Sequence, residues 1–323
     1  MKKGNISIFV PHQGCPCACS FCNQKTITGQ EKLPDAEDVK KAVQTALKKK
    51  EYDYEIAFFG GSFTAIDRDY MLTLLTAAYP YVKSGQVKGI RISTRPDCVD
   101  AEVLEILKKY GVTSIELGAQ SMDDEVLIAN RRGHTAQDVI DASKLIKSYG
   151  FALGLQMMTG LYKDTQQKAI DTAKKIIELA PDTVRIYPTV VLKGTYLAQL
   201  YLKEEYSPLN ADDSAELCAQ LVPMFERANI KIIRLGLHSS KDIKDNMLAG
   251  GFHDSFGELV KSHIMVNKIL ALPPADYQVY VNPRSLSKLK GNNKSNIYLL
   301  IERGYNIKII TDNALDVDEL RIK

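Results

Sequence analysis

The chain has 323 residues, of which 45% are hydrophobic and 25% are charged, and its formal net charge is +3. A chain of this length buries about 75% of its unfolded surface and needs no disulfides to hold a core, in one large domain or two ordinary ones. The small charge neither predicts nor excludes nucleic-acid binding. No apolar run reaches the roughly 18 residues of a membrane helix, and the N-terminus lacks a signal-peptide pattern. We therefore expect a cytoplasmic protein with no membrane partner.

The first apolar run, residues 6–10, is followed by a segment that places four of the six cysteines between Cys15 and Cys22. In a reducing compartment such clusters are more often metal ligands or redox groups than disulfides. A zinc site needs a fourth ligand such as His12, and no second pair with zinc spacing occurs. A thioredoxin-type pair of Cys19 and Cys22 leaves Cys15 without a role. An iron–sulfur cluster on Cys15, Cys19 and Cys22 leaves one iron open for a substrate, as a catalytic metal site requires.

Strands and helices are predicted to alternate along the rest of the chain. Short apolar runs typical of buried strands occur at residues 6–10, 54–60, 89–94, 113–118, 151–158, 183–191 and 230–236. The intervening segments have helical apolar spacing, with capping residues at Asp35 and Thr135, and one helix that starts at Asp164 and stops before Pro181. Cys218 lies on a similar apolar stripe and is predicted to belong to the core.

This alternation predicts a parallel α/β sheet with right-handed crossovers. Seven strands are too few for a closed eight-stranded barrel, which leaves a partial barrel or a doubly wound sheet. Both place the ligand site at the carboxyl ends of the strands. Polar and glycine-rich segments follow the successive runs, as in "GGSFTAID", "STRPD", "GAQS", "QMMTGL", "YPTVVLKGT" and "GLHSS". We therefore expect a binding site along this edge.

The spacing C-x3-C-x2-C, with Phe21 before the last cysteine and a position after the first strand, resembles the radical S-adenosylmethionine (SAM) superfamily. The blocks "FFGGSFTAI", "ISTRPD", "ELGAQSMDDEVL", "NRRGHT", "LQMMTGL" and "VRIYPTVVLKGT" resemble the radical SAM domain of the Elongator catalytic subunit and, less closely, anaerobic coproporphyrinogen oxidase. The similarity spans residues 6–260. It implies a radical SAM enzyme with a partial (β/α) TIM-like barrel at residues 1–250. Residues 251–323 would form a small C-terminal α/β extension, a candidate substrate-facing segment.

The resemblance implies two cofactors, a [4Fe–4S] cluster and SAM. An electron from a donor such as flavodoxin or ferredoxin would then cleave SAM to a 5′-deoxyadenosyl radical. Cys15, Cys19 and Cys22 are the implied cluster ligands, and Cys17 is expected to be a non-ligand. The candidate SAM-binding residues are Gly60, Gly61, Ser62, Ser93, Thr94, Gln120, Arg132 and Gln156. The residue that matches Ser93 is acidic in the coproporphyrinogen oxidase branch.

Individual residues near the strand ends have weaker assignments. Arg132 can bind the SAM carboxylate through two N–H groups, and Arg131 is expected to be a solvated neighbour. Arg95 is either a ligand or one half of a salt bridge within its loop. Tyr187 and His238 follow later strands and are candidates for the substrate side or for packing. His253, in "GFHDSFGEL", has the same two interpretations.

The last part of the chain suggests a partner. Residues 282–308 carry six positive side chains (Arg284, Lys288, Lys290, Lys294, Arg303 and Lys308) against Glu302 alone. Such a segment suits a phosphate backbone, although a solvated helix face has the same composition. About 60 residues follow the radical SAM pattern, so we do not carry over the acetyl-CoA-dependent reaction of the Elongator subunit, which has an acetyltransferase domain after its radical SAM domain. We predict modification of tRNA or another RNA. The alternatives are a porphyrinogen-like small substrate and a non-catalytic iron–sulfur or zinc interaction module.

Overall fold

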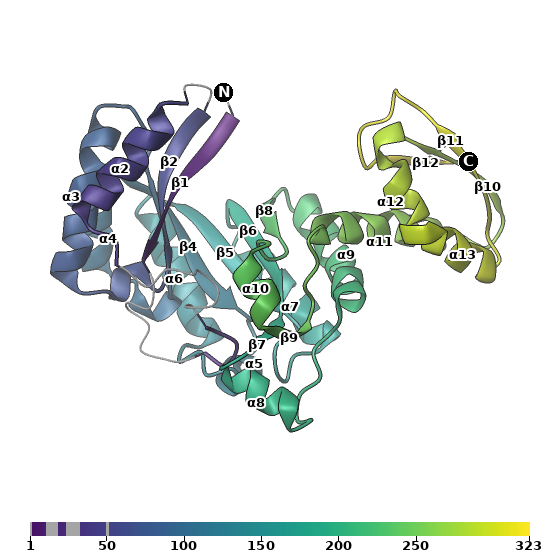
Figure 1. Ribbon diagram of the computed structural model, residues 1–323, viewed down its shortest axis with the longest axis horizontal. Helices are drawn as coiled ribbons and strands as arrows, with labels where there is room; N and C mark the ends of the chain where they lie inside the picture. The colour runs from purple at the N-terminus through teal and green to yellow at the C-terminus, as the bar shows by residue number, and fades with distance from the viewer. Residues whose placement is uncertain (1, 11–18, 24–32, 50–51) are drawn as a thin grey trace.

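The computed structural model describes residues 2–10, 19–23, 33–49 and 52–323. Its centre is a seven-stranded sheet in the order β1-β2-β3-β4-β5-β6-β8, in which every neighbouring pair is parallel. The strands are β1 (Lys2–Val10), β2 (Tyr52–Gly60), β3 (Ile90–Thr94), β4 (Val112–Gln120), β5 (Ala152–Thr159), β6 (Thr183–Pro188) and β8 (Lys231–Leu235). The strand order never reverses, which rules out the doubly wound alternative. The sheet curls into a half-barrel, and the predicted partial barrel is confirmed (Figure 1).

Helices cover the outer face of this sheet. They are α2 (Ala36–Leu47), α3 (Arg68–Lys83), α4 (Ala101–Lys109), α6 (Ala136–Ser148), α7 (Gln166–Glu178) and α9 (Ala211–Arg227). Helices α5 (Asp124–Ala129) and α8 (Tyr196–Leu202) lie instead near the carboxyl ends of the strands (Figure 1), where Val126 and Leu197 belong to small apolar clusters apart from the main core. Asp35 and Thr135 cap α2 and α6 as predicted, and in each case the Asp at the third helical position completes a capping box that was not predicted. The helix expected to start at Asp164 is instead capped by Thr165, because the Asp164 carboxylate accepts from the Gly160 N–H.

The apolar run at residues 183–191 forms two strands rather than one. Pro188 ends β6, since it has no N–H to continue a parallel ladder. The chain then forms β7 (Val190–Leu192), which pairs antiparallel with β9 (Met247–Gly250), after α10 (Lys241–Asn246). This two-stranded sheet lies beyond the carboxyl end of β6.

The two faces of the half-barrel differ in chemistry. Residues such as Ile56, Phe58 and Leu117 point towards the helices and are fully buried in the main core. Cys218 of α9 lies in the same core, where burial raises the pKa of its thiol to about 12. The alternate positions, which face the interior of the half-barrel, include charged residues in the middle of strands. The interior is therefore polar.

The C-terminal extension has a small core of its own. It contains β10 (Asp276–Val281), α12 (Leu286–Lys290), α13 (Ser295–Glu302), β11 (Asn306–Thr311) and β12 (Leu320–Ile322), with β10 in the middle of a three-stranded sheet. Helix α11 (Phe256–Leu270) joins the parts: Phe256 and Val260 pack in the main core, and Val266 and Ile269 in the small one. Figure 1 shows this lobe in yellow, at the opposite end of the molecule from α3. The predicted division at residues 250 and 251 stays a prediction.

Short 3-10 turns complete the described elements, at Phe63–Ala65, Pro96–Cys98, Pro283–Ser285 and Asn292–Lys294. Across the described ranges, no helix has the length and apolar character needed to cross a bilayer.

Candidate active site at the strand ends

The ends of β1 and β2 approach each other so closely that only glycine fits at Gly60. Its φ is +122°, and a Cβ there would lie 2.5 Å from the carbonyl oxygen of Val10. The next residue, Gly61, donates its N–H to the same oxygen at 3.0 Å. Glycine permits this close approach and this left-handed backbone. The "GG" pair therefore brings bare backbone to the edge of the sheet.

Hydroxyl groups connect the ends of β2 and β3. The Thr94 hydroxyl lies 2.7 Å from that of Ser62 and 2.6 Å from that of Thr64, and all three residues are buried. Ser62 Oγ also accepts the N–H of Arg95. The predicted residues Ser62 and Thr94 are thus in contact. Ser93, the residue before Thr94, is half-buried and lies on the interior-facing side of β3. In the strand register it is paired with Glu116 of β4.

Two amides connect the ends of β4 and β5. Gln156 Nε2 donates to Gln120 Oε1 at 3.1 Å. Gln120 ends β4 with a φ of +66°, an uncommon conformation for a residue with a side chain. Backbone strain of this kind persists where the surrounding structure fixes it, and it clusters at functional sites.

Arg132 connects this edge to the cysteine segment. Its side chain is 6% exposed; Nη1 donates to Cys19 Sγ at 3.0 Å and Nη2 to the Gly118 carbonyl at 2.7 Å. The guanidinium carbon lies 6.0 Å from the centre of the Phe21 ring. Within the described ranges, the buried Nε has no hydrogen-bond partner. Arg132 thus keeps one donor for a ligand while holding a cysteine sulfur and β4.

The described part of the cysteine segment is anchored from two sides. Ser20 donates its N–H to the Asn130 carbonyl at 3.0 Å and its hydroxyl to Asn130 Oδ1 at 2.6 Å. The Ser20 carbonyl accepts the N–H of Leu197, at the start of α8. Cys19 is buried and Cys22 is half-buried. The predicted ligand Cys15, together with Cys17 and His12, lies outside the described residues.

Two arginines near the site have structural partners. Arg95 makes a bidentate pair with Asp97, at 2.9 and 2.7 Å, which is the salt bridge weighed as its alternative. The expectation that Arg131 is a solvated neighbour was incomplete. It is exposed, but its guanidinium carbon lies 3.4 Å from the ring centre of Tyr196. Its φ of +55° turns its side chain towards α8.

The residues considered for the substrate side have different surroundings. Tyr187 points into the half-barrel, where its hydroxyl accepts from Arg185 at 3.3 Å. His238 lies at the end of the sheet, with Nδ1 3.3 Å from Arg234 Nη2. His253 accepts the N–H of Ser255 and closes a turn. Tyr187 is thus the one of these three that faces the interior.

An ion-pair cluster inside the half-barrel was not predicted. Glu116 accepts from Arg91 Nη1 at 2.8 Å and from Arg185 Nε and Nη2 at 2.5 and 3.0 Å. Arg91 also pairs with Glu55 at 2.9 Å, and the Arg185 guanidinium lies 5.4 Å from the Phe59 ring centre. The sequence did contain a signal for this cluster: four of the apolar runs carry a single charged residue in the middle, and these residues occupy positions that face one side of the sheet.

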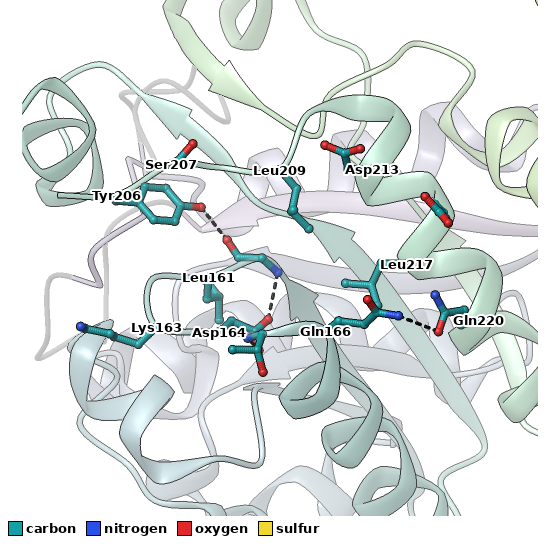
Figure 2. A pocket seen from close by; sticks show the side chains of 13 residues that line it. Leu161, Lys163, Asp164, Gln166, Tyr206, Ser207, Leu209, Asp213, Leu217 and Gln220 are labelled. Carbon is teal, nitrogen blue, oxygen red and sulfur yellow. Dashed lines mark hydrogen bonds between the residues drawn. The ribbon is translucent and has the colours of Figure 1, made fainter. Parts of the chain in front are cut away.

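A separate hollow of about 370 Å³ lies between the loop after β5 and helix α9 (Figure 2). The Tyr206 hydroxyl donates to the Gly160 carbonyl at 2.5 Å, and the Asp164 carboxylate accepts the Gly160 N–H at 2.9 Å. Burial raises the pKa of Asp164 to about 6, against the opposing effect of these backbone bonds. None of the predicted site residues lines this hollow. Its polar groups hold the loop in place.

Comparison with known proteins identifies the class to which this site belongs. Residues 9–176 match the model of the radical SAM superfamily, and residues 181–265 match that of the radical SAM C-terminal domain. The chain belongs to the radical SAM superfamily. It is therefore an enzyme of a family that uses a [4Fe–4S] cluster and SAM. The predicted resemblance is confirmed.

Several named proteins and solved structures are similar to this chain. The tRNA uridine(34) acetyltransferase of Dehalococcoides mccartyi is 27% identical over 79% of this chain and 62% of its own length. Human Elongator complex protein 3 is 30% identical over 53% of this chain and 35% of its own length. Among solved structures, the archaeal Elp3 of Methanocaldococcus infernus has a TM-score of 0.66 at 22% identity, with 84% of this chain and 64% of that chain covered. Coproporphyrinogen III oxidase of Escherichia coli has a TM-score of 0.52 at 16% identity, with 70% and 53% covered, which shows a shared fold. The chain spans less than two thirds of the length of the curated relatives named here.

The described residues fit these cofactors. Cys19 and Cys22 offer thiol ligands of the type that iron–sulfur clusters require. The backbone at Gly60 has no side chain to obstruct a ligand. The buried Nε of Arg132 lacks a partner within the described ranges, and a carboxylate would supply one. His134, two positions after Arg132, is also buried. Its burial, and then the positive charge of Arg132, lower the pKa of its imidazole to about 4.

Proposed function

We propose that this radical SAM enzyme holds its cluster on Cys15, Cys19 and Cys22, binds SAM along the adjoining strand ends, and modifies RNA. The observation that carries the site assignment is the continuous row of contacts from Cys19 through Arg132 to the end of β4. When bound, the cluster and SAM supply reductive cleavage of SAM to a 5′-deoxyadenosyl radical, with an electron from a donor such as flavodoxin or ferredoxin.

The protein's own groups bind and orient SAM in this proposal. Gly60, Gly61 and Ser62 offer backbone and hydroxyl acceptors for the SAM amino group at the end of β2. Arg132 Nε donates to the SAM carboxylate, a charge-assisted bond. Further along the edge, Ser93 and the amides of Gln120 and Gln156 would bind other polar groups of SAM, because an amide both donates and accepts. The Thr94 hydroxyl would act indirectly, since it is bonded to the hydroxyls of Ser62 and Thr64.

Cysteine variants test the cluster assignment. Anaerobic reconstitution with iron and sulfide should give a brown protein whose iron content falls to background in Cys15→Ala, Cys19→Ala and Cys22→Ala. Cys17→Ala is the matched control, because it removes a thiol from the same segment, and it should retain the absorbance of the native protein. A full cluster in any of the first three variants, or its loss in Cys17→Ala, would contradict the assignment.

The RNA target is supported by the relatives named for tRNA uridine modification and by the C-terminal extension. The basic segment at residues 282–308 needs one correction. Lys288 is 8% exposed and forms ion pairs with Asp318 and Glu258, so its charge stabilises the extension and is not available to RNA. The better candidate surface is the outer face of the three-stranded sheet, to which Lys308 of that segment belongs.

This sheet face combines an aromatic ring with positive charges. Tyr280 lies in the middle strand, with the guanidinium carbon of Arg321 4.7 Å and Nζ of Lys323 5.5 Å from its ring centre. Lys308 stands on the other side, opposite Gln278. Arg321 pairs with Asp312, which holds its guanidinium in place. Aromatic and arginine planes on a sheet stack the bases of single-stranded RNA, and nearby lysines bind phosphates.

Binding of labelled tRNA, followed by fluorescence anisotropy at several salt concentrations, tests this surface. Tyr280→Ala should weaken binding about tenfold, since one base stack contributes roughly 1–3 kcal/mol. Lys308→Ala should reduce the salt slope by about 0.7, the contribution of one phosphate contact in a single strand. Lys174→Ala, an exposed lysine on α7, is the control of equal charge. Salt-independent or undetectable tRNA binding would redirect the proposal to a small-molecule substrate.

A further inference from the structure

The loop between α5 and α6 presents alternate residues to the cysteine segment. Asn130 bonds the Ser20 backbone and hydroxyl, and Arg132 bonds the Cys19 sulfur. Arg131 between them has a φ of +55°, and its side chain lies over the Tyr196 ring instead. Two adjacent arginines of the same charge thus have different partners, and one of them touches a cysteine that the proposed function assigns to the cluster.

The contact of Arg132 with Cys19 is held rigidly. Its second terminal nitrogen is bonded to the Gly118 carbonyl, so the guanidinium plane is fixed between β4 and the cysteine segment. The residue is 6% exposed, which reduces solvent screening of its charge. Both terminal nitrogens donate to protein atoms, so they do not bind a carboxylate with two parallel hydrogen bonds. The predicted contact of two Arg132 N–H groups with the SAM carboxylate therefore does not describe what this side chain does towards Cys19.

A positive N–H donor on a cluster sulfur affects the electron equilibrium. Reduction adds one negative charge to the cluster, and a donor at the sulfur stabilises the more negative form. Hydrogen bonds to the sulfurs, net charge and exposure are established determinants of cluster potential. The effect requires that the donor be charged, buried and in contact with a ligand sulfur, and Arg132 meets all three conditions.

We propose that Arg132 is a positioning residue that raises the reduction potential of the cluster through its hydrogen bond to Cys19 and thereby favours uptake of the electron. The proposal rests on the cysteine assignment made above. It assigns Arg132 a role towards the cluster in addition to any bond of its Nε to SAM.

Redox titration of the reconstituted protein, without SAM or substrate, tests the proposal. The fraction of reduced cluster is followed by electron paramagnetic resonance against solution potential. Arg132→Met should shift the equilibrium at least tenfold towards the oxidised cluster, which is 59 mV for a one-electron couple. Arg132→Lys keeps the positive charge but lacks the planar guanidinium, so it should shift this equilibrium in the same direction by less.

Arg131→Met is the matched control, because it removes an arginine one position away that does not touch Cys19. Its potential should equal that of the native protein. A native potential in cluster-loaded Arg132→Met would overturn the proposal. So would Arg132→Met protein that folds normally but loads no cluster while Arg131→Met loads fully, because Arg132 would then serve assembly. Failure of the native protein itself to load a cluster would refute the proposed function instead.

Discussion

Replacing Glu116 by glutamine should lower the free energy of unfolding by more than the loss of any single surface ion pair would. Glu116 has a side-chain exposure of 6% and accepts three hydrogen bonds from Arg91 and Arg185. Glutamine has nearly the same volume, so the change creates no cavity. It removes the negative charge, and one of its two terminal groups is a donor that faces guanidinium N–H groups. Two arginines then remain in the half-barrel with less negative charge to compensate them.

The structure indicates the size of the effect. Removing one partner of a buried ion pair costs about 3–5 kcal/mol, because an uncompensated charge stays buried. Arg91 and Arg185 have side-chain exposures of 14% and 17%, and Arg91 keeps its pair with Glu55. Arg185 keeps the Tyr187 hydroxyl and the Phe59 ring. Because these contacts remain, we expect Glu116→Gln to lower the free energy of unfolding by about 3 kcal/mol, the lower end of that range.

Urea unfolding followed by circular dichroism measures this loss. With a urea dependence of about 3 kcal/mol per molar, the midpoint should fall by roughly 1 M in Glu116→Gln. Glu55→Gln is the control: Glu55 is more exposed and bonds Arg91 alone among the arginines, so it should cost about 1 kcal/mol or less. A loss below 1 kcal/mol in Glu116→Gln, or equal losses in the two variants, would show that the Glu116 charge does not hold the two arginines in the half-barrel.

Two further predictions concern the site. Gly60→Ala should lower the free energy of unfolding by about 2–4 kcal/mol and weaken SAM binding, because its Cβ would lie 2.5 Å from the Val10 carbonyl oxygen in a left-handed backbone. Urea unfolding measures the first effect and equilibrium dialysis the second. Native values in both measurements would contradict the prediction. His134 is neutral when folded and has a pKa of about 4 instead of 6.5, so the unfolded state binds more protons between these values. Stability should therefore fall by on the order of 3 kcal/mol as pH drops from 6.5 to 4. His134→Gln should lack this part of the pH dependence, and an identical profile would contradict the assignment.

The fold could be predicted from the sequence because strand and helix have different apolar periods and because crossovers have one hand. The same rule predicts a site where the parallel strands end at one edge, and the structure brings the predicted residues Gln120 and Gln156 together there. The break at Pro188 was also readable in principle: a proline within an apolar run ends a parallel ladder.

Specific contacts could not be predicted, because they depend on distances between residues far apart in the chain. Nothing in the "NRRG" motif says which arginine reaches Cys19; the left-handed backbone at Arg131 decides it. Lys288 counts as a free charge in the sequence, although its partners Glu258 and Asp318 lie 30 residues away on either side. Composition locates charge along the chain, and only the tertiary structure shows whether that charge is paired.

We propose that the cysteine segment and the strand ends together form a site for reductive SAM cleavage. The most direct measurement is release of 5′-deoxyadenosine after SAM and dithionite are added to the anaerobically reconstituted protein. The native protein and Cys17→Ala should release 5′-deoxyadenosine, and Cys19→Ala should release none above background. A cluster-loaded native protein that binds SAM but releases no 5′-deoxyadenosine would contradict it.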